Sequence, residues 1–194
     1  MEDNRFRRAR IRWCVETDIK ANVIETDAWH SISTEGSTNL RVTNNSITSI
    51  PNWTGPYTML TIYSNFNMIV RGNSFEGNGV FPGITAYRES YNFVNDTTFI
   101  EGNIMNNLFG HAINLFRHNT IIKENKILNF SQGNAIRVDG SKTDITNNYI
   151  HCTGESSVSG ITLPVRNLDY GPIYNYARIY HNSVNIVSAN AQFG

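Results

Sequence analysis

Aromatic and charged side chains recur at one position in the chain, directly after short segments in which apolar and polar residues alternate. Tyr63, Tyr87 and Phe116 each follow the apolar residue that ends such a segment, and Asp139 takes the same place further on. If the segments are strands stacked in register, these side chains point outward and form one strip. Aromatic and charged groups in a strip of this kind favour sugar binding. The alternatives are a stabilising exterior aromatic ladder and a surface buried against another subunit.

Polar residues beside the same segments complete the candidate binding surface. Thr61, Thr85, Asn114, Arg137 and Thr162 take the outward position just before the strip residues, and Arg88, Glu89, Arg117 and His118 lie just beyond the segments. The predicted substrate-binding residues are Tyr63, Tyr87, Phe116, Arg88, Arg117 and Asn114. The predicted catalytic residues are Glu89, Asp139, Arg137 and His118.

Two reactions fit these groups. Hydrolysis of a glycosidic bond needs two carboxyl groups, about 5–5.5 Å apart for retention of configuration or about 6.5–9.5 Å for inversion. Glu89 and Asp139 are expected two repeats apart, while Glu101 and Glu124 fall on the next face. Lyase chemistry instead needs a base and a group that neutralises a uronate. Arg117, His118, Arg137 and Tyr87 are its candidates, and the sequence shows no Asp-rich calcium cluster.

A repeated motif positions these segments. It consists of an apolar residue, two variable residues, Asn, one variable residue and a second apolar residue, as in Ile122-Lys123-Glu124-Asn125-Lys126-Ile127. The same pattern surrounds Asn22, Asn45, Asn73, Asn103, Asn125, Asn148 and Asn182. A motif that persists while its spacing varies indicates a solenoid. Asn suits a turn because it tolerates the left-handed backbone region, and stacked copies are expected to bond through their amides.

A second short strand follows the Asn turn in each of the first six repeats. Examples are Leu60-Thr61-Ile62, Ile113-Asn114-Leu115 and Ile136-Arg137-Val138. Their alternation predicts strands with one face inward. The sequence therefore predicts an all-β solenoid of about seven rungs, with residues 1–17 as an N-terminal edge segment and residues 18–194 as the solenoid domain.

The motif copies, together with strands such as Gly83-Ile84-Thr85-Ala86 and Gly160-Ile161-Thr162-Leu163, resemble the repeats of right-handed parallel β-helix proteins. These repeats occur in the pectate-lyase-like superfamily and in phage tailspike depolymerases. The resemblance covers about residues 18–187. It implies the fold, and it leaves the reaction open because the superfamily holds lyases, hydrolases, epimerases and non-catalytic members.

Composition and charge give no support to nucleic-acid binding, membrane insertion or a metal site. Sixteen basic and sixteen acidic residues balance, so net charge gives no argument for nucleic acid or an anionic membrane. No stretch is apolar enough to span a membrane, and the start Met-Glu-Asp-Asn-Arg is not a secretory signal. Cys14 and Cys152 are expected to be free thiols. We predict no cofactor and no metal, because His30, His111, His151 and His181 share no metal-site spacing.

Both ends of the predicted solenoid lack an amphipathic helix that could cover them. The basic segment Arg5–Arg12 is interpreted as an edge strand whose arginines discourage end-to-end association, with a polyanion-binding arm as the alternative. We expect the ends to be covered by partner chains or by further domains.

These observations lead to one functional hypothesis and two alternatives. The leading hypothesis is recognition of a cell-surface polysaccharide, with possible cleavage, as in tailspike-type depolymerases. That resemblance implies a homotrimer and a location in the virion tail or outside the cell. The alternatives are a non-catalytic structural or adhesive β-helix, and a secreted polysaccharide lyase or C5-epimerase.

Overall fold

The computed structural model describes residues 1–26, 31–50, 58–63, 66–79, 82–87, 96–140, 142–153, 157–164 and 176–187. Within these ranges the regular structure consists of β-strands, and no helix is found. The strands are β1 (Arg5–Phe6), β2 (Ala9–Arg12), β3 (Asp18–Lys20), β4 (Val23–Thr26), β5 (Ile32–Glu35), β6 (Arg41–Thr43), β7 (Ser46–Ser49), β8 (Leu60–Tyr63), β9 (Met68–Arg71), β10 (Ser74–Glu76), β11 (Ile84–Tyr87), β12 (Thr98–Glu101), β13 (Ile104–Asn106), β14 (Ile113–Leu115), β15 (Thr120–Lys123), β16 (Lys126–Leu128), β17 (Gly133–Val138), β18 (Thr143–Thr146), β19 (Tyr149–Thr153), β20 (Val158–Thr162), β21 (Ala177–Tyr180) and β22 (Ser183–Val187).

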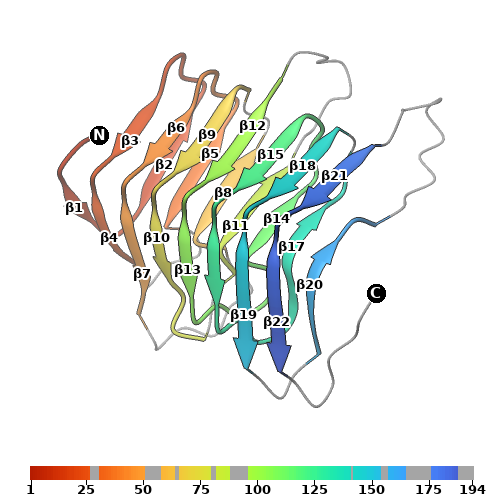
Figure 1. Cartoon of the computed structure of the whole chain (residues 1–194). Coiled ribbons are helices and arrows are strands. Elements are labelled where there is room, and N and C mark those ends of the chain that lie inside the picture. Colours follow the sequence, from red (N-terminus) through yellow and green to blue (C-terminus); the bar gives the residue numbers. More distant parts are fainter. Residues whose placement is uncertain are drawn as a thin grey trace.

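Every third strand along the chain joins the same sheet (Figure 1). Sheet A runs from β3 through β6, β9, β12, β15 and β18 to β21; sheet B runs from β1 to β22, and sheet C from β2 to β20. All neighbouring strands are parallel. The chain therefore winds as a right-handed parallel β-helix of about seven rungs, which confirms the fold predicted from the motif.

The alternating pattern of the strands explains the core. Equivalent inward residues stack from rung to rung, as Ile100, Ile122 and Ile145 do in sheet A, and all three are fully buried. In sheet C, Ile84 pairs with Ile113 in the same way. Apolar rows from the three sheets meet inside the coil and form one core cluster. The strand-and-turn repeat is thus stabilised by burial where a rung is stacked between two others.

The turn between sheets A and B carries a continuous ladder of Asn side chains. The Oδ1 atom of Asn125 accepts hydrogen bonds from the backbone N–H and the Nδ2 of Asn103, both at 3.0 Å. Asn125 repeats this toward Asn148, again at 3.0 Å. Its Nδ2 also donates to the carbonyl oxygen of Ile100 at 2.9 Å. The expected amide bonding from coil to coil is confirmed for the seven motif residues (Asn22, Asn45, Asn73, Asn103, Asn125, Asn148, Asn182).

Two details of this turn differ from the sequence-based expectation. The left-handed backbone conformation belongs to the residue before the ladder Asn, with φ of 62° at Gly102 and 60° at Glu124. The Asn therefore contributes hydrogen bonds to the turn rather than a left-handed backbone. The ladder also begins one rung earlier than predicted. The backbone N–H of Asn4 donates to Oδ1 of Asn22 at 3.1 Å, and Asn4-Arg5-Phe6 matches the second half of the motif.

Residues 1–17 continue the same winding. Strands β1 and β2 pair in register with β4 and β5 and stand at one edge of sheets B and C. Arg5 bonds both carboxylate oxygens of Glu25, and Arg12 pairs with Glu35 at 2.8 Å. The basic N-terminal segment is therefore an edge rung of the solenoid, with some of its arginines paired to the next rung.

Candidate functional site

The three aromatic residues of the predicted strip form a row on the outer face of sheet C. Tyr63 and Tyr87 are register partners on β8 and β11, and their ring centroids lie 5.2 Å apart with planes inclined by 9°. Phe116, one residue after β14, stacks on Tyr87 at 5.3 Å and 7°. The guanidinium carbon of Arg137 lies 5.5 Å from the centroid of Phe116. We call these four residues the aromatic ladder.

Stacking decides which parts of the rings a ligand can reach. Because in-register strands are about 4.8 Å apart, rings in one outward row turn their faces toward one another. Both faces of Tyr87 are therefore directed at ladder neighbours, and one face of Phe116 is directed at Arg137. Tyr87 is nevertheless 37% exposed. A ligand that approaches the ladder from outside therefore meets ring edges rather than the ring faces on which a sugar would stack.

The outward row beside the ladder is less open than predicted. Thr61, Thr85 and Asn114 are 1%, 3% and 9% exposed, although they point away from the core. The hydroxyl of Thr58 donates to Oγ1 of Thr85 at 3.2 Å, so this part of the outer face is covered. The buried Oδ1 of Asn114 has no hydrogen-bond partner among the described residues. Arg137, the register partner of Asn114, is only half-buried.

Arg117 was expected on the surface as a sugar ligand, but its side chain is 1% exposed. Its Nη2 pairs with Asp96, its Nε donates to Oγ1 of Thr98 at 3.0 Å, and its Nη1 lies 3.4 Å from the carbonyl oxygen of Tyr87. Asp96 also accepts the backbone N–H of Asn67 at 2.7 Å. The guanidinium thus links its own rung to the preceding one at the corner between sheets C and A, and Asp96 extends the network by one more rung to Asn67.

Asp139 and His118 lie at the same corner. The backbone N–H of Asp139 donates to the carbonyl oxygen of Leu115 at 2.7 Å, and its side chain is half-buried. Gly140 follows, and a Cβ atom there would lie 1.8 Å from the carbonyl oxygen of Arg117, so only glycine fits. His118 is half-buried, and its carbonyl oxygen accepts the hydroxyl of Thr120 at 3.4 Å. Arg88 and Glu89 lie outside the described residues.

A polar chain near Arg137 was not predicted. The backbone N–H of Asn134 donates to Nδ1 of His111 at 3.0 Å, so this nitrogen carries a lone pair. The hydroxyl of Thr162 donates to Oδ1 of Asn134 at 2.8 Å. Burial, and then the charge of Arg137, lower the pKa of His111 below its ordinary value. His111 and Asn134 are 23 residues apart and Asn134 and Thr162 are 28 residues apart, so no local sequence pattern indicates these contacts.

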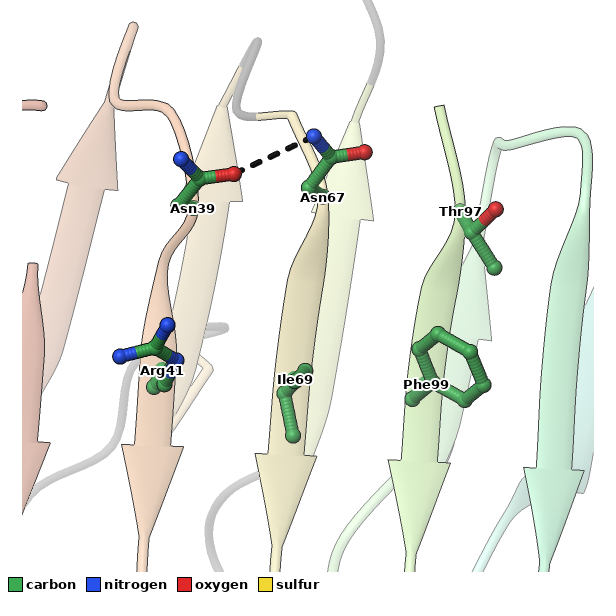
Figure 2. A pocket seen from close by; sticks show the side chains of 6 residues that line it. All are labelled: Asn39, Arg41, Asn67, Ile69, Thr97 and Phe99. Atoms are coloured by element: carbon green, nitrogen blue, oxygen red, sulfur yellow. Dashed lines mark hydrogen bonds between the residues drawn. The ribbon is translucent and has the colours of Figure 1, made fainter. Parts of the chain in front are cut away.

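A concavity lies on the outer face of sheet A, and none of the predicted site residues lines it (Figure 2). Its volume is about 360 Å³. Ile69 lies between Arg41 and Phe99, and the side chains of Asn39 and Asn67 bond to each other at 3.2 Å beside them. Thr97 completes the lining. Arg41 is not free of partners, since its Nη1 lies 3.5 Å from the carboxylate of Asp18.

Metal and membrane features are absent from the part of the chain that the structure describes. It contains no group of three His, Cys, Asp or Glu side chains placed to hold a metal ion. Nor does it contain a helix long and apolar enough to cross a membrane. Cys14 is exposed and Cys152 is buried, and both thiols are free, as predicted.

The fold and the ladder define the class of protein as a parallel β-helix with a stacked aromatic row on one sheet. Comparison with known proteins adds no narrower class. No protein family, no curated protein and no solved structure shows significant similarity to the chain.

Proposed function

We propose that this protein binds a cell-surface polysaccharide along the outer face of sheet C, in the manner of a depolymerase-like β-helix. The observation that carries the proposal is the aromatic ladder, Tyr63–Tyr87–Phe116, ended by the guanidinium of Arg137. It runs along the solenoid axis, so its shape suits a linear polymer rather than a compact ligand.

The bonding groups of the ladder suit a hydroxyl-rich chain. The exposed Tyr87 offers a hydroxyl that donates and accepts, and Arg137 offers hydrogen bonds to hydroxyls or to a uronate carboxylate. Since the ring faces are turned toward one another, the polymer contacts ring edges and polar tips.

Cleavage is the finer part of the proposal. Of the predicted hydrolytic pair, Asp139 belongs to the described residues, and hydrolysis requires Glu89 as its partner. Lyase chemistry would instead use Arg137, His118 and Tyr87. The likeness to tailspike and pectate-lyase-like repeats adds, as proposals, a homotrimer and a location in the virion tail or outside the cell.

One observation favours the second candidate, a structural or adhesive β-helix. The near-parallel rings, inclined by 9° and 7°, form a continuous stack that stabilises neighbouring rungs by itself. On this alternative the ladder is an assembly surface, and no polysaccharide binds to it.

Binding is tested with Tyr87→Ala and Arg137→Gln against a panel of capsular and uronate polysaccharides, by affinity electrophoresis. Each variant is expected to weaken binding about fivefold or more, because truncating an anchor residue of an interface costs about 1 kcal/mol or more. Phe99→Ala on sheet A is the matched control and leaves binding unchanged. A protein that binds no polymer of the panel, or variants that bind as tightly as the parent, would overturn the proposal in favour of the structural alternative.

Cleavage is tested on the same polymers by size-exclusion chromatography and ultraviolet absorbance. Shortened chains with the absorbance of unsaturated uronates indicate lyase chemistry and direct mutagenesis to Arg137, His118 and Tyr87. Shortened chains without it indicate hydrolysis, and Asp139→Asn or Glu89→Gln is then expected to abolish turnover while binding remains.

A further inference from the structure

The rung made of β20, β21 and β22 exposes one of its two sides. Each of these strands stands at the end of its sheet and pairs on one side only among the described residues (Figure 1). We call the exposed side of this rung the C-terminal face. Its strands therefore carry backbone N–H and C=O groups along an open edge, the kind of edge that accepts a further strand.

Residues of the core row are partly exposed on this face. Ile179 and Val184 occupy the positions that Ile145 and Ile150 hold one rung earlier. Ile145 and Ile150 are fully buried, whereas Ile179 and Val184 are 47% and 48% exposed. At Ile145 and Ile150, the rungs on both sides bury the side chain. A rung stacked on the C-terminal face would bury Ile179 and Val184 in the same way.

The Asn ladder has a direction, and its last donor is on this face. From Asn22 onward, each ladder Asn donates its backbone N–H and its Nδ2 to Oδ1 of the Asn one rung further on, as Asn148 does to Asn182 at 2.9 Å. The backbone N–H of Asn182 has no acceptor among the described residues. An Asn in a following rung would accept it. That Asn would also donate to the carbonyl oxygen of Ile179, as Asn182 donates to that of Ile145 at 2.8 Å.

We infer that the C-terminal face binds one further polypeptide coil, which carries the pattern apolar–x–x–Asn–x–apolar and lies parallel to β21 and β22. The template is the rung-to-rung contact that the chain itself repeats along its length. Apolar residues before and after the Asn cover Ile179 and Val184, and the Asn continues the ladder. This inference concerns the end of the solenoid and is independent of polysaccharide binding on sheet C.

The experiment uses a synthetic peptide with the sequence of residues 120–128, Thr-Ile-Ile-Lys-Glu-Asn-Lys-Ile-Leu, added to the intact protein. Binding is followed through the backbone amide of Asn182 in 1H–15N NMR spectra. The expected result is a saturable downfield shift of this amide. A matched peptide in which Leu replaces Asn is expected to bind about tenfold more weakly, since it leaves a buried donor unsatisfied. Equal binding of both peptides, or no shift at Asn182, would overturn the inference.

Two protein variants test whether the peptide binds at the C-terminal face. Val184→Lys is expected to abolish binding, because it puts a charge in the core row at a position already 48% exposed, where the rung itself can stay folded. Val23→Lys, at a residue 43% exposed on the outer surface, leaves binding unchanged. If the Asn182 amide shifts with protein concentration alone, a second copy of the chain occupies the face, and the inference of a separate coil is wrong.

Discussion

At the scale of single residues, the buried Arg117–Asp96 pair defines the corner beside the candidate site. Both side chains are almost fully buried, and Arg117 also bonds to Thr98. We predict that Arg117→Ala lowers the free energy of unfolding by about 3–5 kcal/mol, because it leaves the Asp96 carboxylate buried without its cation. Chemical denaturation measures this.

The control for that prediction is Arg178→Ala, which removes an exposed arginine paired with Asp144 on the outer face of sheet A. Ion pairs of this exposed kind contribute little to stability. A similar loss in both variants would show that the corner network has no special role.

His111 gives a prediction of pH dependence. Its folded pKa lies below its ordinary value, so the unfolded chain takes up a proton at higher pH than the native state does. The contribution of neutral His111 to the free energy of unfolding is therefore complete above the ordinary pKa of about 6.5. It is lost as the pH falls from there toward the folded pKa. Urea midpoints between about pH 7.5 and about pH 5.5 measure the loss. His111→Gln, which keeps an acceptor for Asn134, should show a smaller change across the same window.

At the scale of the element, the Asn turn holds sheets A and B together. Asn103→Leu leaves the backbone N–H of Asn73 and the carbonyl of Val70 without their partner. We predict that this substitution lowers the free energy of unfolding by about 3 kcal/mol or more, because each unsatisfied buried group costs roughly 1–3 kcal/mol. The comparison is Asn129→Ala, which removes an exposed amide bond to Asn106 and should change thermal stability only slightly.

The elements also show how far the sequence alone leads. The motif predicted the solenoid, the in-register stacking of its strands and the Asn ladder, because each copy of the motif is recognised from residues a few positions apart. The place of Asn4 in the ladder was not predicted, because only the second half of the motif is present around it. The burial of Arg117 depends on Asp96 and Thr98, which lie 21 and 19 residues away and are adjacent only after the coil has closed. The covering of Thr85 by Thr58, 27 residues apart, has the same origin.

At the scale of the whole molecule, a solenoid in which each rung contacts its neighbours has no uniform stability. We predict that amide hydrogen exchange is slowest near Ile100 and Ile122, which are fully buried, and fastest in β21 and β22, where Ile179 is 47% exposed. Mass spectrometry of exchanged peptides measures this gradient. Equal protection from end to end would mean that the coil opens as one cooperative unit.

The Asn-to-Asn steps of 22, 23, 28, 30 and 34 residues end at the same turn every time, whatever length of chain intervenes. The turn therefore acts as punctuation, and the chain between two turns behaves as a cassette. Removing one whole cassette, such as residues 103–124, would join Gly102 to Asn125 and preserve the phase of all three sheets. Removing a few residues fewer would shift every later strand by a fraction of a turn. A protein built in this way can change its length and its surface loops by whole coils while its interior stays the same.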